Sequence, residues 1–374
     1  MNTADHNFMS RAIQVARQGR FITRPNPSVG CVLVRDDEVV AEGHTQPAGG
    51  FHAERMALAE AGYRARGATA YVSLEPCSHT GRTSPCADAL IDAGVSRVVF
   101  AGVDPYAKVA GAGLDKLRAA GVQVDGPLMQ AQAEAINPGF LKRARCQLPY
   151  VVMKSASSVD GRTAMASGES KWITGPAARG DVQKIRALSS AIITGVDSVL
   201  QDDSRLTLRA EELAVDARSL DWLMANPPLR VVLDSHGRLS ADAAICRSEA
   251  PTLWVTGADV DRTIPNIEHI RLPLENGRLP LVEVLQLLAG RQCNQVLVEA
   301  GPTLSGAFLA AGLVDYWYLY MAPKLMGSSA NPLLRLPFEK MSESVNLDIA
   351  EVRTIGDDLR FGIQLAEGAV CLPV

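Results

Sequence analysis

The stretch that decides the fold begins at His52-Ala53-Glu54 and continues at Glu75-Pro76-Cys77-Ser78-His79-Thr80-Gly81-Arg82-Thr83-Ser84-Pro85-Cys86. His52, Cys77 and Cys86 offer one imidazole and two thiols, which is a set of three zinc ligands. A catalytic zinc ion keeps its fourth position open for water, whereas a structural zinc ion takes four protein ligands. Glu54 stands two residues after the histidine and can carry protons without binding the metal. The stretch therefore predicts a catalytic zinc site with Glu54 as its acid–base residue.

The combination of His-x-Glu, Pro-Cys and a second Cys is the established signature of zinc-dependent nucleobase deaminases. Zinc lowers the pKa of its bound water to about 7, so that hydroxide can attack the ring carbon that bears the amine. Glu54 would accept the proton of that water and deliver protons to the ring nitrogen and the leaving amine. A structural zinc site is the alternative, because His79 could serve as a fourth ligand.

The segments around these ligands predict that the metal lies at the start of two helices. Residues 68–74 alternate and are rich in β-prone side chains, which indicates a strand. Pro85 precedes a short helix over residues 86–94 that closes on a glycine, and a second helix begins at residues 52–54 and runs to 61. The positive dipole ends of these helices would favour thiolate over thiol.

Composition limits the class of protein. The chain has 374 residues, of which 47% are hydrophobic and 21% charged, and these values predict a soluble protein of two domains. Its net charge is −4, and no Lys/Arg cluster suggests a nucleic-acid-binding face. We expect no signal peptide and no membrane span, because the start lacks a basic and apolar leader and no apolar run approaches ~20 residues. The seven scattered cysteines do not form a disulfide pattern, so we expect a cytoplasmic protein.

The first half alternates strands and helices. A helix is predicted over residues 8–17, a hairpin of strands over 29–34 and 39–43, and a strand, helix and strand over 96–102, 114–120 and 122–124. This alternation indicates an α/β layer. Asn26, in the turn before the hairpin, could read the edge of a heterocycle, although an ordinary turn asparagine is the alternative.

The second half begins after a helix over residues 131–145 that is interrupted near Asn137-Pro138, and we place the domain boundary near residue 147. Strands are predicted over residues 150–156, 191–195, 229–234, 252–256 and 294–299, and helices over 176–189, 196–200 and 281–288, with a helical insertion over 210–226. The turn at Gly301, followed by Thr303 and Ser305 at a helix start, could bind a phosphate, an ordinary strand-to-helix turn being the alternative. Gly111-Ala112-Gly113 lacks the third glycine of a dinucleotide fingerprint.

The whole chain resembles the bifunctional riboflavin-biosynthesis deaminase–reductases. The motifs that match the deaminase half are Asn26-Pro27-x-Val29-Gly30-Cys31, His52-Ala53-Glu54 and Pro76-Cys77-Ser78-His79-x-Gly81-Arg82-Thr83. The motifs that match the reductase half are Lys154-x-x-x-Ser158-x-Asp160-Gly161, Trp172-Ile173-Thr174, Asp202-Asp203-x-x-Leu206-Thr207-x-Arg209, Asp234-Ser235 and Glu299-x-Gly301-Pro302. The resemblance implies an α/β chain with an N-terminal cytidine-deaminase-like domain over residues 1–147 and a C-terminal dihydrofolate-reductase-like domain over residues 148–374.

The resemblance also implies two reactions. The first domain would deaminate 2,5-diamino-6-(5-phosphoribosylamino)pyrimidin-4-one to 5-amino-6-(5-phosphoribosylamino)uracil, with one zinc ion on His52, Cys77 and Cys86. The second would reduce the ribosyl group to ribityl with NADPH. The implied NADPH contacts are Ala156, Trp172, Thr174, Ser198, Asp202, Ser235, Gly301, Pro302, Thr303, Leu304, Ser305, Gly306 and Ala307. The candidate substrate contacts are Asn26, Lys154, Ser170, Arg186, Leu206, Arg209 and Glu299.

Some of these roles also follow from side-chain chemistry. Arg186 and Arg209 are planar forks suited to a substrate phosphate. Lys154 and Glu299 are ionisable groups at strand ends, where either could assist the proton step. The resemblance further implies a homodimer through the reductase domain, acting on small phosphoribosyl pyrimidines.

Three other interpretations stay open at this point. One is a nucleoside or tRNA deaminase with an appended domain, which predicts a basic face and gives no reason for the second-half motifs. Another is a nucleotide-sensing or structural protein that uses zinc only for folding. A third is a chain that keeps only one of the two activities.

Overall fold

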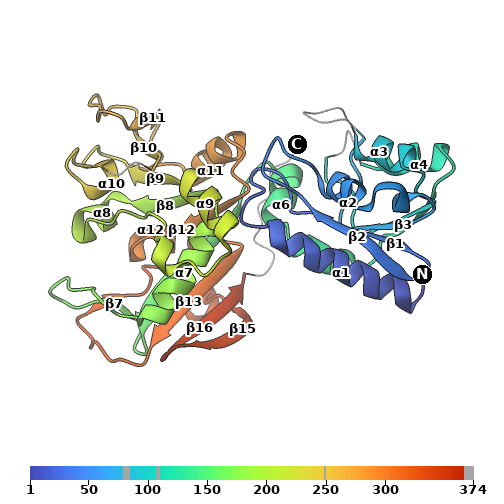
Figure 1. Ribbon diagram of the computed structural model, residues 1–374. Helices are drawn as coiled ribbons and strands as arrows, with labels where there is room; N and C mark the ends of the chain where they lie inside the picture. The colour runs from blue at the N-terminus through green and yellow to red at the C-terminus, as the bar shows by residue number, and fades with distance from the viewer. Residues whose placement is uncertain (79–84, 107–109, 248–249, 366–374) are drawn as a thin grey trace. The chain divides into compact units, whose positions relative to one another are not determined.

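The computed structural model describes residues 1–78, 85–106, 110–247 and 250–365, and Figure 1 shows their helices and strands. The chain divides into two compact units, unit 1 over Met1–Arg145 and unit 2 over Cys146–Val374. Each unit has its own main sheet. Across the described residues, no helix is both long and apolar enough to cross a membrane.

Unit 1 is built on a mixed five-stranded sheet with the order β2-β1-β3-β4-β5. Strands β1 and β2 form an antiparallel hairpin, and β3, β4 and β5 run parallel to one another. The strands are β1 (Gly30–Arg35), β2 (Glu38–His44), β3 (Thr69–Val72), β4 (Arg97–Phe100) and β5 (Gln123–Asp125). The helices are α1 (Thr3–Gly19), α2 (Ala53–Ala61), α3 (Cys86–Asp92), α4 (Ala112–Ala119), α5 (Gln130–Glu134) and α6 (Pro138–Cys146), with the 3-10 turn η1 (Gly62–Ala65).

The two faces of this sheet carry separate apolar clusters, because successive strand side chains point to opposite faces. Met9 and Ile13 of α1 pack with Val32 of β1 on one face. Ala57 of α2 and Leu90 of α3 pack on the other. Figure 1 shows α1 on the opposite side of the sheet from α2 and α3. The result is a three-layer α/β/α arrangement that carries α2 and α3 on the same face.

Unit 2 is built on a nine-stranded sheet with the order β11-β10-β9-β8-β12-β6-β13-β16-β15. The strands from β11 to β13 are parallel, and the hairpin of β15 and β16 adds an antiparallel edge. The strands are β6 (Tyr150–Ser158), β8 (Ala191–Gly195), β9 (Leu229–Asp234), β10 (Thr252–Gly257), β11 (Glu268–Leu272), β12 (Gln295–Val298), β13 (Tyr316–Ala322), β15 (Asp348–Ile355) and β16 (Asp358–Gln364). A small separate sheet pairs β7 (Arg162–Ala164) with β14 (Asn331–Pro332).

Helices cover both faces of the larger sheet. Leu285 of α11 and Phe308 of α12 belong to the apolar cluster on one face, and Val182 of α7 and Val199 of α8 belong to the cluster on the other. The helical segments are α7 (Pro176–Leu188), α8 (Val196–Asp202), α9 (Ala217–Ala225), α10 (Ala244–Arg247), α11 (Leu281–Gly290) and α12 (Pro302–Ala310), with the 3-10 turns η2 (Ala210–Glu212) and η3 (Met341–Glu343). Parallel strands between two helical layers place their carboxyl ends at a common edge, which is where ligands bind in such sheets.

The structure confirms the expected α/β class and the helices and strands predicted as far as residue 308. The first helix begins earlier than its apolar pattern suggests, because Asn2 and Asp5 cap each other's backbone amides. The sequence-based expectations include no element after residue 308, whereas the structure has β13, β14, β15 and β16 there.

Candidate functional site

The three predicted zinc ligands come together in unit 1. His52 is the residue before α2, Cys86 is the first residue of α3, and Cys77 lies in the segment after β3. Their ligand atoms all lie within 4.8 Å of one another. Nδ1 of His52 is 3.6 Å from Sγ of Cys77 and 3.3 Å from Sγ of Cys86. Zinc bound tetrahedrally at about 2.3 Å from sulfur and about 2.0 Å from nitrogen would separate such atoms by about 3.5 Å, so the donors fit the metal.

Helix α2 reaches this position because β2 lets it approach closely. A Cβ added at Gly43 would lie 2.3 Å from the carbonyl oxygen of Ala53 and 2.5 Å from the amide nitrogen of Ala57. Only glycine leaves room for the first turn of α2 against the strand. This contact fixes the helix start that carries His52 and Glu54.

Hydrogen bonds from helix α3 and from the histidine favour a thiolate at Cys77. The amide of Cys86 donates to Sγ of Cys77 at 3.3 Å. The Cys86 thiol, His52 and that amide together lower the pKa of Cys77 to about 4. Because a metal-binding cysteine must be deprotonated, this arrangement prepares Cys77 as a ligand.

Glu54 is the second residue of α2, and its side chain is buried. Burial and the negative charge of Cys77 raise its pKa to about 7. A carboxyl group that can gain and lose a proton near neutral pH suits a general acid–base role. The structure therefore places the expected proton carrier beside the three ligands.

The ligand cluster has three members among the described residues of unit 1. His79, the possible fourth ligand of a structural site, lies outside the described residues. Asn26 lies in the turn before β1, where its own amide donates to the carbonyl of Thr23. Its neighbour Ser28 is held by Asn137, which accepts from the amide of Ser28 and donates to its carbonyl.

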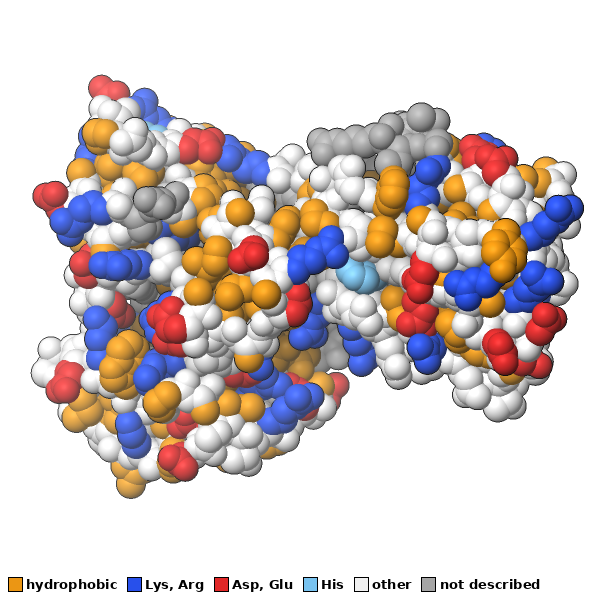
Figure 2. Space-filling view, in the orientation of Figure 1, with side chains coloured by type: hydrophobic (Ala, Val, Ile, Leu, Met, Phe, Trp, Pro, Cys, Tyr) orange, Lys and Arg blue, Asp and Glu red, His pale blue; other side chains and the backbone are white. Residues whose placement is uncertain are grey.

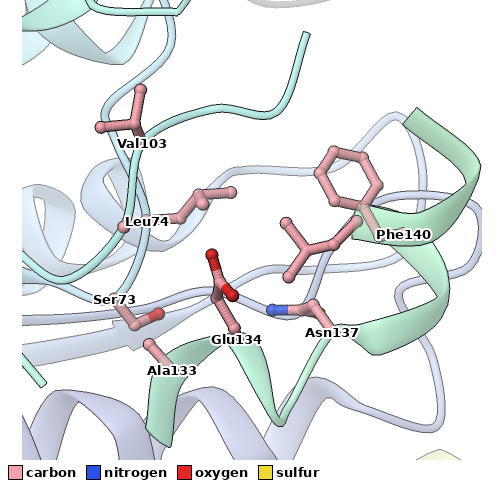
Figure 3. Close-up of a pocket in the computed structure, with 9 residues that line it drawn as sticks. Ser73, Leu74, Val103, Ala133, Glu134, Asn137 and Phe140 are labelled. Carbon is pink, nitrogen blue, oxygen red and sulfur yellow. The ribbon is translucent and has the colours of Figure 1, made fainter. Parts of the chain in front are cut away.

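A separate small pocket of unit 1 lies between the ends of β3 and β4 and helices α5 and α6 (Figure 3). The polar side chains of Ser73, Glu134 and Asn137 and the apolar side chains of Leu74 and Phe140 contribute to its wall. None of the three zinc ligands lines it, so this pocket is distinct from the metal centre.

A buried ionic cluster lies at the carboxyl end of β12 in unit 2. Glu299 follows the last residue of β12, and Arg186 of α7 donates to it with Nε at 2.5 Å and Nη2 at 2.9 Å. Lys154 of β6 completes the cluster, and burial lowers its pKa. Burial opposes ionisation of Glu299, but the charge and hydrogen bonds of Arg186 outweigh it and lower the pKa of that carboxyl. The cluster thus pairs an ionised carboxylate with a lysine that releases its proton more readily than usual.

The two arginines expected to bind a phosphate differ in the structure. The third nitrogen of Arg186, Nη1, donates to the carbonyl of Thr207 at 3.0 Å, so all three of its nitrogens are engaged inside the protein. Glu299 and the carbonyl of Thr207 thus already engage the Arg186 side chain, and its expected role as a phosphate ligand stays a prediction. Arg209 pairs with Glu212 through Nη1 and keeps 39% of its side chain exposed.

Several of the implied cofactor and substrate contacts pair with one another. The amide of Gly301 donates to Oγ of Ser198 at 3.0 Å, and the hydroxyl of Ser170 donates to Asp202 at 2.8 Å. Trp172 is 56% exposed, and Arg179 of α7 lies over its ring. The structure thus brings the start of α12 beside α8, and the segment before α7 beside the end of α8.

Other implied contacts lie against their own chain. The hydroxyl of Ser305 donates to the carbonyl of Ala300, and Gly306 is buried in α12. Leu206 is buried in the apolar cluster beneath α7. Ala156 lies in β6 beside Tyr320 of β13. The remaining implied cofactor residues lie in the segment before α7, after β9 and in the first turns of α12, namely Thr174, Ser235, Pro302, Thr303, Leu304 and Ala307.

The sequence analysis did not predict the polar side chains that fix helix α7 to β13 and β16. Asp358 of β16 accepts the amide of Gly175 at 2.8 Å. Asp181 of α7 accepts from Tyr320 at 2.7 Å and from Arg360 at 2.5 Å. The apolar residues at 359, 361 and 363 alternate with polar ones or glycine, and this period would have indicated strand β16.

Two family models match the chain. The first, described as the cytidine and deoxycytidylate deaminase zinc-binding region, matches residues 2–102. The second, described as the RibD C-terminal domain, matches residues 149–361. The first match covers the metal centre, and the second covers the ionic cluster of unit 2.

Known proteins are similar over nearly the whole chain. The riboflavin biosynthesis protein RibD of Escherichia coli K12 is 48% identical over 358 residues, which are 95% of this chain and 98% of that protein. The structure of Acinetobacter baumannii RibD, form 1, has a TM-score of 0.90 at 43% identity and covers 97% of this chain and 99% of that one. A Thermotoga maritima structure described as a diaminohydroxyphosphoribosylaminopyrimidine deaminase/5-amino-6-(5-phosphoribosylamino)uracil reductase has a TM-score of 0.85 at 30% identity, with the same coverage.

Proposed function

The chain belongs to the RibD family of bifunctional riboflavin-biosynthesis deaminase–reductases, and we propose from this premise that residues 1–147 form the deaminase domain and residues 148–374 the reductase domain. The first domain contains the zinc-binding region of a deaminase, and the second is an NADPH-dependent reductase domain. The proposed substrate is 2,5-diamino-6-(5-phosphoribosylamino)pyrimidin-4(3H)-one. Its deaminated product, 5-amino-6-(5-phosphoribosylamino)uracil, is the substrate proposed for the second domain, which reduces the ribosyl group to ribityl.

The observation that supports the deaminase proposal is the convergence of His52, Cys77 and Cys86 beside the buried Glu54. These three ligands would hold zinc, which when bound supplies a water of lowered pKa. Glu54 would accept a proton from that water and pass protons to the ring nitrogen and the departing ammonia.

The buried cluster of Lys154, Arg186 and Glu299 supports a reductase site at the carboxyl end of β12. Lys154 would assist proton transfer to the sugar, because burial lowers its pKa and makes its proton easier to release. Arg186 keeps Glu299 ionised. Of the two arginines, Arg209 is the one whose side chain stays partly exposed, and it is therefore the proposed ligand of the substrate phosphate. An Arg209→Ala variant with an unchanged reductase KM would remove Arg209 from this role.

A single optical trace tests the two-step proposal. NADPH oxidation is followed with the diaminopyrimidinone phosphoriboside as sole substrate, so that reduction requires prior deamination. We expect oxidation by the native chain, none by Glu54→Gln, and restored oxidation by Glu54→Gln when the deaminated product is supplied directly. A chain that oxidises NADPH only with the deaminated product would retain the reductase alone, which would contradict the proposed pair of activities.

We also propose that the chain forms a homodimer through β15. This strand is at the edge of the unit 2 sheet, and its neighbourhood exposes Val345, Leu347, Ile349 and Val352. Antiparallel pairing of two copies about Val352 would place Glu351 of one chain opposite Arg353 of the other, so the edge is self-complementary in charge. Light scattering should then report a dimer, which Val352→Lys converts to monomer and Met341→Lys, an exposed site outside the strand, leaves intact. A native monomer at assay concentration would reject this proposal.

A cytoplasmic location is proposed from the state of the cysteines. Five of the six described cysteines, namely Cys31, Cys77, Cys86, Cys246 and Cys293, carry free thiols, as expected in a reducing compartment. The disulfide at Cys146 departs from the sequence-based expectation that the cysteines form no disulfide pattern. Cell fractionation tests the proposal, and recovery of the protein outside the cytoplasmic fraction would contradict it.

A further inference from the structure

Glu75 is a buried carboxylate that comes two residues before the zinc ligand Cys77. Its two oxygens accept hydrogen bonds from three backbone amides. Oε2 accepts from Asp104 at 3.1 Å and from Gly111 at 2.9 Å, and Oε1 accepts from Gly113 at 2.9 Å. These amides belong to the segment after β4 and to the start of helix α4. The carboxylate therefore connects the Cys77 segment to the beginning of α4.

The backbone packs tightly at the same point. A Cβ added at Gly113 would lie 1.9 Å from the carbonyl oxygen of Pro76, a distance that no side chain could occupy. The first turn of α4 thus rests directly on the peptide that precedes Cys77. The contact and the three hydrogen bonds of Glu75 act on one short segment, Glu75-Pro76-Cys77.

Helix α3 binds Cys77 directly, through two of its backbone amides. The amide of Cys86 donates to Sγ of Cys77, and the amide of Ala87 donates to the carbonyl oxygen of Cys77 at 3.2 Å. An ion pair between Lys116 of α4 and Asp88 of α3 joins the two helices at 2.5 Å. Cys77 is consequently fixed between α3, which binds it directly, and α4, which is connected to it through Glu75.

We propose that Glu75 is a positioning residue of the metal centre, which orients Cys77 toward His52 and Cys86 by fastening the preceding residues to the start of α4. This proposal rests on the zinc-binding role proposed above. Outer groups that orient a metal ligand typically contribute 10- to 100-fold to metal affinity or activity. Glu75 differs from Glu54 in function, because its oxygens are already engaged by amides and leave it a fixed acceptor.

The test compares the full-length native chain with Glu75→Gln. The amide group of glutamine keeps the size of the side chain but replaces one acceptor oxygen by a donor, which would face backbone N–H groups. After removal of bound metal, zinc affinity is measured by competition with a chromogenic chelator. We expect about 10- to 100-fold weaker zinc binding for Glu75→Gln. Asp115→Asn is the matched control, since Asp115 is an exposed acid in the first turn of α4, and its affinity should equal that of the native chain.

The absorption spectrum of the Co²⁺-substituted protein reports ligand geometry separately from stability. Glu75→Gln should change the thiolate-to-cobalt and ligand-field bands, while Asp115→Asn should not. Native zinc affinity together with a native cobalt spectrum in Glu75→Gln would overturn the proposal, even if the variant unfolds more easily. The native chain and His52→Ala separate this result from the proposed function, because a native chain that binds no zinc, or a His52→Ala variant that binds it equally well, would refute the zinc site itself.

Discussion

Arg186 and Glu299 form a bidentate ion pair in which both side chains are only about one-tenth exposed, 11% and 10% respectively. The pair joins α7 to the end of β12, and Lys154 adds a second positive charge to the cluster. Two cations thus depend on one carboxylate in a site largely removed from water. Removing one member of such a buried pair is costly, because the remaining charge keeps its desolvation penalty without its partner.

Glu299→Gln should therefore destabilise unit 2 by about 3 kcal/mol. All four tryptophans, at 172, 222, 254 and 317, lie in unit 2, so tryptophan fluorescence during urea unfolding follows this unit alone. Glu268→Gln is the matched control, because Glu268 also takes two hydrogen bonds from one arginine, Arg291, but is half exposed. The free energy of unfolding of Glu268→Gln should fall by less than about 1 kcal/mol. Equal losses of unfolding free energy in the two variants would contradict the claim that burial makes the Arg186–Glu299 pair costly to break.

Glu54→Gln should lower the rate of ammonia release by at least about 100-fold, because glutamine cannot accept the proton of the attacking water. The zinc content should remain at one ion per chain, since the ligands are His52, Cys77 and Cys86. Ammonia release and metal analysis of the same preparation measure both effects. Glu60→Gln, an exposed acid on the same helix, serves as control and should behave as the native chain. Loss of zinc from Glu54→Gln would instead make Glu54 a ligand.

The sequence allowed the metal centre to be predicted because its residue types are chemically specific. One histidine, two cysteines and a nearby glutamate occur together in few kinds of site, and Pro85 marks the start of α3. The reductase half could be predicted only in part. The family resemblance implied that Arg186 and Glu299 belong to one site, but nothing in their spacing of more than one hundred residues showed that they bind each other.

The features of unit 2 that were not predicted are those that depend on tertiary contacts. In the sequence Asp358 and Arg360 are ordinary polar residues, and only the folded sheet brings them to α7. Glu75 is a similar case in unit 1, because its three donors come from residues 104, 111 and 113. A residue pattern predicts which side chains take part in a reaction more readily than it predicts which backbone groups hold those side chains in position.

Asp5 should make unit 1 sensitive to acid. Arg97 donates to it at 2.7 Å, Tyr71 donates to it at 2.8 Å, and the pKa of this carboxyl is held well below its usual range chiefly by the hydrogen bond from Arg97. A carboxyl with a lowered folded-state pKa stabilises the fold in full above its unfolded pKa of about 3.9, and the contribution is lost as the pH falls below that value.

Asp5→Asn should consequently destabilise unit 1 at pH 7, and the difference from the native chain should shrink between about pH 5 and pH 3. Because unit 1 lacks tryptophan, hydrogen exchange of peptides from α1 and β4 is the appropriate measurement. Asp36→Asn is the control, since Asp36 lies in a turn with a side chain 90% exposed. A difference between Asp5→Asn and the native chain that stays constant with pH would rule out the ionised carboxylate as its cause.

Asp358 should affect cofactor binding although it lies in the edge hairpin. Its carboxylate accepts the amide of Gly175, the residue between Thr174 and helix α7, and its side chain is buried. Asp358→Ala would leave that amide without its partner, a loss worth about 1–3 kcal/mol. If this disorders the segment from Trp172 to Thr174, NADPH should bind roughly 5- to 30-fold more weakly, as measured by titration of NADPH fluorescence.

Two comparisons make the Asp358 result specific. Asp357→Ala changes the adjacent, exposed acid of the same turn and should leave the Kd for NADPH unaltered. Ammonia release by unit 1 should be native in both variants, because Gly175 and Asp358 belong to unit 2. An unchanged Kd for NADPH in a folded Asp358→Ala variant would mean that the segment before α7 does not depend on this hydrogen bond for cofactor binding. A raised Kd for NADPH together with normal ammonia release would instead connect the edge hairpin to the reductase site through the start of α7.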